Sequence, residues 1–165
     1  MKLTTLCYLR YEDDVLMLFR DKKENDVNHG KWIGIGGKFL PDESPDECAL
    51  REIQEETGLV AETLIYRGVV TFCYDEAPAE YMHVYSGTVK TRTVTACDEG
   101  TLRWVPEEDV PDLALWPGDR LFLPLALDEE APAFSMKLVY QKDLLVQAAL
   151  NGQPLKISVV QGLFA

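Results

Sequence analysis

The chain has few residues that bind soft metals. It contains two histidines and four cysteines, and the cysteines form no C-x-x-C pair, so we expect no zinc site. Cys7, Cys48 and Cys73 lie in apolar patterns, which are typical of buried free thiols in a reducing compartment.

Long apolar runs are also absent. No segment approaches the roughly 18 apolar residues that a membrane span needs. Charged residues at positions 10–14 interrupt any signal-peptide core near the N-terminus. We therefore expect a cytoplasmic protein without a membrane partner.

Positive charge is scarce. The chain carries 28 Asp and Glu residues against 16 Lys and Arg, a formal net charge of −12. This balance argues against a nucleic-acid polymer as partner, because Lys and Arg supply the affinity for its phosphates. An acidic protein that takes a polyphosphate ligand needs cations between the two.

What remains is an ordinary globular composition. The 165 residues are 47% hydrophobic and 27% charged, which is enough for one domain, 1–165, with a substantial core. Repeats and linkers are missing. Strand and helix patterns alternate irregularly, which predicts an α/β fold with a mixed sheet sandwiched between helices.

The stretch 37–59 organises the chain, and its local pattern is that of a helix. Ser44 and Glu47 can form a capping box, Pro45 suits the first helical position, and Gly58 can end the helix. An apolar stripe is expected to face the core, formed by Ala49, Leu50 and Ile53.

Three glutamates fall beside that stripe at helical spacing: Glu52, Glu55 and Glu56. Like charges at this spacing repel by roughly 0.2–0.5 kcal/mol per pair, so the cluster is either a solvated acidic face or a ligand site. A glycine-rich turn precedes the helix and lets backbone groups approach a ligand closely (Gly34, Gly36 and Gly37). Hard carboxylate oxygens favour Mg²⁺.

The full spacing is specific. Gly37 is followed by Glu43, by Arg51-Glu52-Ile53, by Glu55-Glu56 and by Gly58-Leu59, and this pattern resembles the Nudix signature at every defined position. The resemblance implies the Nudix fold and a hydrolase that cleaves phosphoanhydride bonds.

The resemblance also implies roles for individual residues. Glu52, Glu55 and Glu56 would hold Mg²⁺, with Mn²⁺ able to substitute, helped by the carbonyl of Gly36 or Gly37. Arg51 would orient the glutamates, together with Glu43. Three candidates stay open for the general base, namely Glu55, Glu56 and Glu99 of the acidic loop 98–100. The products would be a nucleoside monophosphate and pyrophosphate.

Beyond this stretch, the patterns predict further elements. The expected strands are Leu3–Arg10, Val15–Arg20, Trp32–Gly37, Ala61–Tyr74, Tyr81–Lys90, Thr101–Val105, Ala133–Tyr140 and Leu144–Leu150. The first two and the last two of these should form hairpins, and Gly68 can bend the long strand. A loop spans 21–31, a short helical turn spans 106–113, and a helix spans 117–127, where Pro124 should bend or break it. The apolar run Leu155–Val160 is left unplaced.

Outlying segments resemble the MutT-type nucleoside triphosphatases, especially the oxidised-purine branch. They are residues 31–38, 71–74, 115–119 and 123–125. This likeness implies a base framed by Phe72, Tyr74 and Trp116 and read by Asp119, with Thr5, Ile33 and Lys38 also binding substrate.

Two positions depart from that branch. It has Asn where this chain has Ile33, and a second Asp where this chain has Gly118. Neither residue has a side chain that can hydrogen-bond a base edge, and a site that lacks polar partners loses discrimination. The likeness therefore predicts a purine nucleotide and leaves the preference for an oxidised purine such as 8-oxo-dGTP open.

Other readings stay open. A Nudix hydrolase of dinucleotides or nucleotide sugars would share the signature helix. A prenyl diphosphate isomerase would need a catalytic cysteine in a context that this chain does not show, and a ligand-sensing Nudix module would usually lack a complete signature. The sequence does not decide between a monomer and a homodimer, nor does it assign a role to 151–165.

Overall fold

The computed structural model describes residues 1–156, in which nine strands form one sheet. The strands are β1 (Lys2–Tyr11), β2 (Asp14–Phe19), β3 (Trp32–Ile33), β4 (Thr63–Tyr74), β5 (Glu80–Thr88), β6 (Thr101–Pro106), β7 (Phe134–Gln141), β8 (Leu144–Leu150) and β9 (Gln153–Leu155). Their order is β3-β2-β1-β5-β4-β7-β8-β9, with β6 paired to β2. The helices are α1 (Pro45–Thr57), a 3₁₀ helix (Glu107–Asp112) and α2 (Asp119–Ala126).

The sheet is mixed. β1 pairs with β5 and β4 pairs with β7 in parallel, and the other pairs are antiparallel. Both predicted hairpins, β1–β2 and β7–β8, are confirmed. The predicted bend in β4 is also present, because its pairing with β5 shifts register between Tyr66 and Gly68.

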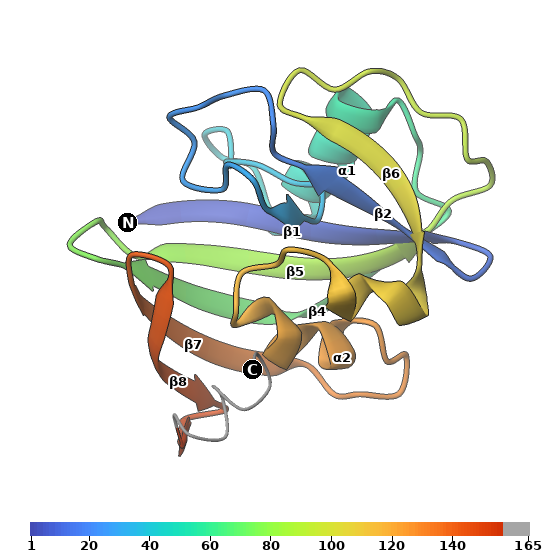
Figure 1. Cartoon of the computed structure of the whole chain (residues 1–165). Coiled ribbons are helices and arrows are strands. Elements are labelled where there is room, and N and C mark those ends of the chain that lie inside the picture. Colours follow the sequence, from blue (N-terminus) through green and yellow to red (C-terminus); the bar gives the residue numbers. More distant parts are fainter. Residues whose placement is uncertain (157–165) are drawn as a thin grey trace.

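Apolar side chains leave both faces of the sheet. Along β1, Leu6 and Tyr8 join a core cluster that includes residues of α2, whereas Cys7 and Leu9 join a second cluster with Ala49 of α1. Figure 1 shows α1 at the top of the molecule and α2 in front of β4 and β7. The predicted mixed sheet between helices is therefore confirmed. No helix in residues 1–156 has both the length and the apolar character that crossing a bilayer requires.

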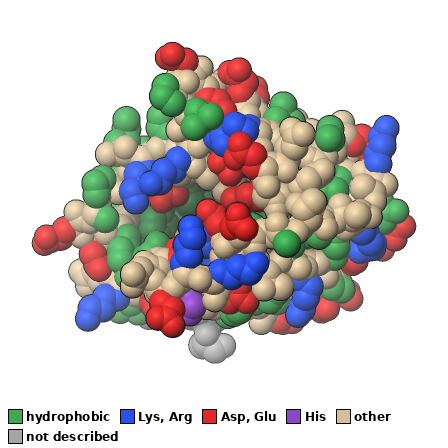
Figure 2. Space-filling view, turned by 90° about the horizontal axis from the view of Figure 1, so that it is seen from above, with side chains coloured by type: hydrophobic (Ala, Val, Ile, Leu, Met, Phe, Trp, Pro, Cys, Tyr) green, Lys and Arg blue, Asp and Glu red, His purple; other side chains and the backbone are tan. Residues whose placement is uncertain are grey.

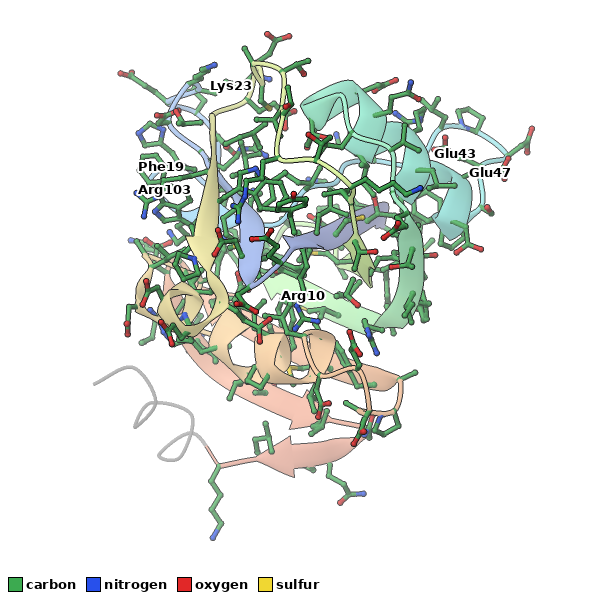
Figure 3. All side chains as sticks on the ribbon, turned by 90° about the vertical axis from the view of Figure 1, so that its right-hand side faces the viewer. Arg10, Phe19, Lys23, Glu43, Glu47 and Arg103 are labelled. Carbon is green, nitrogen blue, oxygen red and sulfur yellow. The ribbon has the colours of Figure 1, made fainter. Side chains whose placement is uncertain are left out.

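Helix α1 begins and ends as its sequence predicts. The Glu47 N–H donates to Ser44 Oγ at 3.1 Å, the Ser44 N–H donates to Glu47 Oε1 at 3.0 Å, and Gly58 takes a φ of 76°. Figure 3 shows Glu43 and Glu47 near the start of this helix, at the right of the view, and Phe19 and Arg103 at the left.

The predicted apolar stripe of α1 is wrong at one position. Leu50 is 48% exposed, whereas Ala49 and Ile53 are fully buried together with Cys48. At about 100° per residue, Glu56 projects about 20° from Ala49 on the side away from Ile53, and Leu50 projects about 60° beyond Ile53 on the other side. The inward face of α1 is thus centred on a glutamate, and the leucine lies at its outer edge.

The structure also answers three other points of the sequence analysis. The strand predicted for Trp32–Gly37 is regular only at Trp32–Ile33, after which Ile35 and Lys38 make isolated bridges to β1. Pro124 does not break its helix, since α2 runs from Asp119 to Ala126 with Pro124 inside it and without the backbone N–H at that position. The run Leu155–Val160 contributes the end of β9, and residues 157–160 lie outside the described part of the chain.

The corrected inward face of α1 makes a direct prediction. Ile53→Ala should lower the free energy of unfolding by about 2–5 kcal/mol, because it removes a fully buried side chain. The matched control Leu50→Ala should lower it by less than about 1 kcal/mol. Urea unfolding of both variants measures this, and equal losses would contradict the placement of the helix.

Candidate active site

Three carboxyl groups from two segments meet beneath α1. Glu52 and Glu56 come from the helix, and Glu99 comes from the loop before β6. The negative charge of Glu99 acts on both Glu52 and Glu56 and raises the pKa of each. Burial first, and then the negative charges of Glu99 and Glu52, raise the pKa of Glu56 to about 9. Glu56 Oε2 is buried and has no hydrogen-bond partner among the described residues.

Arg51 holds several acidic side chains at once. Its Nε and Nη2 donate to the two oxygens of Glu43 at 2.7 and 3.0 Å. Its Nη1 donates to Glu52 Oε1 at 2.8 Å and to Glu55 Oε2 at 3.1 Å. The bond from Arg51, followed by one from the Leu40 N–H, lowers the pKa of Glu43 to about 2. The predicted pairing of Arg51 with Glu43 is present.

The glycine turn fits closely against this cluster. A Cβ at Gly37 would lie 2.6–2.8 Å from the Glu52 carboxylate, and a Cβ at Gly36 would lie 1.9 Å from the Thr5 carbonyl oxygen. Any side chain here would therefore displace the backbone or the glutamate. The Gly37 carbonyl accepts the Thr5 N–H at 3.0 Å, which favours the Gly36 carbonyl of the two as a possible metal ligand.

The residues of this cluster suit a divalent cation. The donors are hard carboxylate and carbonyl oxygens, and Glu56 Oε2 is a buried acceptor that needs a partner. The part of the chain that the structure describes contains no ready-made group of three metal-ligating side chains. Glu52 and Glu55 are bonded to Arg51 instead, so they have to turn away from it to complete a metal site.

A cavity of about 470 Å³ opens beside the cluster, within the range of small-molecule sites. The hollow in Figure 2 has a hydrophobic interior and both basic and acidic side chains around its rim. Most of the predicted site residues line the cavity: Thr5, Ile33, Gly36, Gly37, Lys38, Arg51, Glu52, Phe72, Glu99, Trp116 and Asp119. Glu55, Glu56 and Tyr74 do not line it. Glu55 is 60% exposed in its side chain.

Aromatic rings form the far wall of the cavity. The rings of Phe72 and Trp116 meet edge to face, 5.2 Å apart, and the Trp116 Nε1 donates to Asn28 Oδ1 at 2.7 Å. The Lys31 ammonium lies 4.3 Å from the Trp116 ring centroid. Tyr74 was expected to frame a base, but its ring lies next to those of Phe72 and Trp116 outside the cavity lining.

Asp119 is a buried carboxyl group in this wall. The residue is 6% exposed, and burial raises its pKa to about 8 although Arg120 and Lys31 act in the opposite direction. The hydroxyl groups of Tyr8 and Tyr140 feel its charge. Near neutral pH Asp119 is therefore largely protonated, and it can donate as well as accept a hydrogen bond.

The two departures from the resembling branch have different structural settings. Ile33 lines the cavity with an apolar side chain. Gly118 packs tightly, since a Cβ there would lie 2.5 Å from Leu138 Cδ1 and 2.6 Å from the Tyr140 hydroxyl oxygen. The Gly118 N–H donates to that hydroxyl at 2.8 Å. An aspartate at 118 thus has no room beside Tyr140.

Sequence reasoning missed several residues that line the cavity: Lys2, Thr4, Arg20, Asn28, Glu80 and Met82. Arg20 donates to Asp26 at 2.6 Å and to Glu99 at 3.3 Å, which ties the loop 21–31 to the acidic cluster. Glu80 could have been found, because it directly precedes a predicted strand in the same alternation as Met82. Asn28 has no such signal, because its position depends on how the loop folds.

Comparison with known proteins agrees with this geometry. Residues 2–126 match the NUDIX domain family. An oxidized purine nucleoside triphosphate hydrolase of Mus musculus is 33% identical over 110 residues, which cover 66% of this chain and 70% of the relative. A protein of the same name from Danio rerio is 29% identical over 130 residues, covering 78% and 81% of the two chains.

Solved structures share the fold. The MutT protein of Bacillus halodurans superposes with a TM-score of 0.77 at 24% identity, over 93% of this chain and 100% of that chain. The NUDIX domain of Shewanella oneidensis NrtR, solved with ADP ribose, gives a TM-score of 0.63 at 20% identity, over 76% and 86%. With a family match over most of its length and a complete signature helix beside the cavity, this chain belongs to the NUDIX domain family and is a Nudix hydrolase.

Proposed function

We propose that this protein hydrolyses nucleoside triphosphates, converting a (d)NTP and water to a (d)NMP and pyrophosphate with the help of Mg²⁺, and that it acts on purine nucleotides. The observation that carries the proposal is that one cavity joins the acidic cluster of α1 to the aromatic wall. A nucleotide has the matching polarity, with an anionic chain at one end and an aromatic base at the other.

The polyphosphate end lies at the glycine turn. Nudix hydrolases generally use divalent metal ions. Here Glu52, Glu56 and the Gly36 carbonyl would hold Mg²⁺, with Glu55 turning inward from Arg51. The bound cation would neutralise phosphate charge and activate water. Lys38 lines the same end and can contact phosphate oxygens directly.

Three residues remain candidates for the general base: Glu55, Glu56 and Glu99. Of these, Glu99 lines the cavity, and its side chain is 34% exposed. Arg20 donates to one of its oxygens at 3.3 Å, and the Glu99 side chain also meets that of Glu56. This arrangement favours Glu99, with Glu56 as a metal ligand beside it.

The base end lies between Phe72 and Trp116. The half-buried ring of Phe72 offers stacking or edge contact to a purine, Trp116, 2% exposed, packs edge to face against it, and Asp119 can exchange hydrogen bonds with the purine edge. The relatives named as oxidized purine nucleoside triphosphate hydrolases support purine substrates. Because Ile33 offers no hydrogen bond, we expect only weak preference for an oxidised over a normal purine.

Removing the buried carboxylate of Glu56 should separate metal binding from folding. We expect Glu56→Gln to keep the fold, to lower kcat by orders of magnitude, and to lose the rise in Tm that Mg²⁺ gives the wild type. Glu47→Gln is the matched control, because it makes the same charge change at a helix position where Gln also completes a capping box. Full activity of Glu56→Gln, or of wild type in excess chelator, would contradict the proposed metal site.

The bond that breaks can be identified with isotope-labelled water. With dGTP and Mg²⁺ in H₂¹⁸O, the label should appear in dGMP, because water attacks the innermost phosphorus and pyrophosphate leaves intact. Mass spectrometry of both products measures this. Label in pyrophosphate would place the attack on the neighbouring phosphorus. Release of orthophosphate, or turnover of ADP-ribose alone in a substrate panel, would exclude the proposed reaction.

Burial of Asp119 should make stability depend on pH. Because its pKa is raised from 3.8 to about 8 on folding, the folded state keeps this proton more tightly, and stability is lost as pH rises between these values. The difference in free energy of unfolding between Asp119→Asn and the wild type should therefore shift in favour of the variant by about 1–3 kcal/mol as the pH rises from 5 to 9. Asp109→Asn, at an exposed position, is the control. Parallel pH profiles for wild type and Asp119→Asn would refute the buried carboxyl.

A further inference from the structure

Glu80 lies on the floor of the cavity, and none of the roles proposed so far uses it. It is the first residue of β5, where its Cα partners are Phe72 on β4 and Lys2 on β1. Since paired residues share a face of the sheet, Glu80 points to the same side as Phe72 and Met82. All three line the cavity.

One oxygen of the Glu80 carboxylate is fixed by the protein. The Thr4 hydroxyl, in a residue only 7% exposed, donates to Glu80 Oε2 at 2.9 Å. Within residues 1–156, no other side chain bonds to this carboxylate and no Lys or Arg nitrogen lies within 4.0 Å of it. A negative charge beside an apolar floor favours a hydrogen-bond donor at its second oxygen.

The position of Glu80 is midway between the two ends of the site. Lys38 bridges to Thr4 on β1, Thr4 bonds to Glu80 on β5, and Glu80 pairs with Phe72 on β4. Neighbouring strands are about 4.8 Å apart, so the path from Lys38 to Phe72 spans roughly 15 Å, which a nucleotide can cover. The nucleoside has to pass over Glu80 to reach the aromatic wall.

We propose that Glu80 is a specificity-determining residue, whose carboxylate accepts a hydrogen bond from the exocyclic amino group of a guanine base or from the 2′-hydroxyl of the ribose. This inference rests on the proposed function. A carboxylate cannot donate, so it disfavours a carbonyl oxygen or a phosphate at this point and selects for N–H or O–H groups. It also helps to keep the polyphosphate at the glycine turn.

The donor has two possible sources, the exocyclic amino group of the base and the 2′-hydroxyl of the ribose. Four substrates separate them: GTP, dGTP, ITP, which lacks the amino group, and dITP, which lacks both groups. The measurement is kcat/KM for each substrate with wild type, Glu80→Gln and the control Glu76→Gln. Glu76 is an exposed loop residue, and its substitution changes net charge by the same amount.

We expect Glu80→Gln to lower one ratio by about three- to thirtyfold, because the charged acceptor of a donor group is lost. A fall in GTP over ITP assigns the contact to the amino group, and a fall in GTP over dGTP assigns it to the ribose. Thr4→Val, which frees the carboxylate, should shift the same ratio in the same direction by a smaller factor. Glu76→Gln should shift neither ratio.

The outcomes also separate this inference from the proposed function. If the wild type hydrolyses these nucleotides and Glu80→Gln, still folded by its Tm, changes neither ratio, Glu80 does not contact the nucleoside and the inference is wrong. If the wild type hydrolyses none of the four, the proposed function itself fails, and the inference falls with it.

Discussion

Glu56 is held inside the protein next to Glu52 and Glu99, and burial together with these two charges raises its pKa to about 9. A buried carboxylate destabilises the folded state unless it is protonated or its charge is balanced by nearby groups. The surrounding features compensate locally. Arg51 binds Glu43, Glu52 and Glu55, the capping box fixes the start of α1, and Gly36 and Gly37 bring backbone within contact of the cluster. The helix, the turn and the loop at Glu99 are all arranged around one buried carboxyl group.

The cavity combines two chemically different halves on one sheet. At the edge of β1, the glycine turn and Glu52 present hard oxygen atoms and Lys38 presents positive charge. Over β4, Phe72 and Trp116 present aromatic surface. The loop 21–31 touches both halves, since Arg20 at its start bonds to Glu99 and Asn28 bonds to Trp116. The strand spacing of the sheet sets the distance between the two halves.

Sequence patterns predicted the local structure well where it depends on residues close together in the sequence. The caps of α1, the two hairpins and the bend at Gly68 depend on neighbouring residues, and all are found. Leu50 was misplaced because an apolar residue was assumed to face inward, whereas the structure turns Glu56 towards the centre of that face. Polarity alone does not reveal this rotation.

The site was predicted only in part, because some of its residues are set by local patterns and others by tertiary packing. The signature spacing and the resemblance to the oxidised-purine branch identified about half of the cavity lining, because both rest on distinctive residue types. Thr4 and Asn28 were missed because they reach the cavity only through strand pairing and loop folding, whereas Glu80 was overlooked although it alternates with Met82. Tyr74 was included because the segment 71–74 resembles the oxidised-purine branch, but its ring lies next to Phe72 and Trp116, outside the cavity lining.

The packing around Gly118 constrains how this pocket can change during evolution. An aspartate at 118 would collide with Leu138 and with the Tyr140 hydroxyl, which also accepts the Gly118 N–H. A smaller residue at 140, introduced alone, would leave that buried N–H without a partner and open a void. Each single step is therefore unfavourable, although the two together could be tolerated. A second carboxylate at position 118 therefore calls for coupled changes at 118 and 140, so the two positions are expected to vary together.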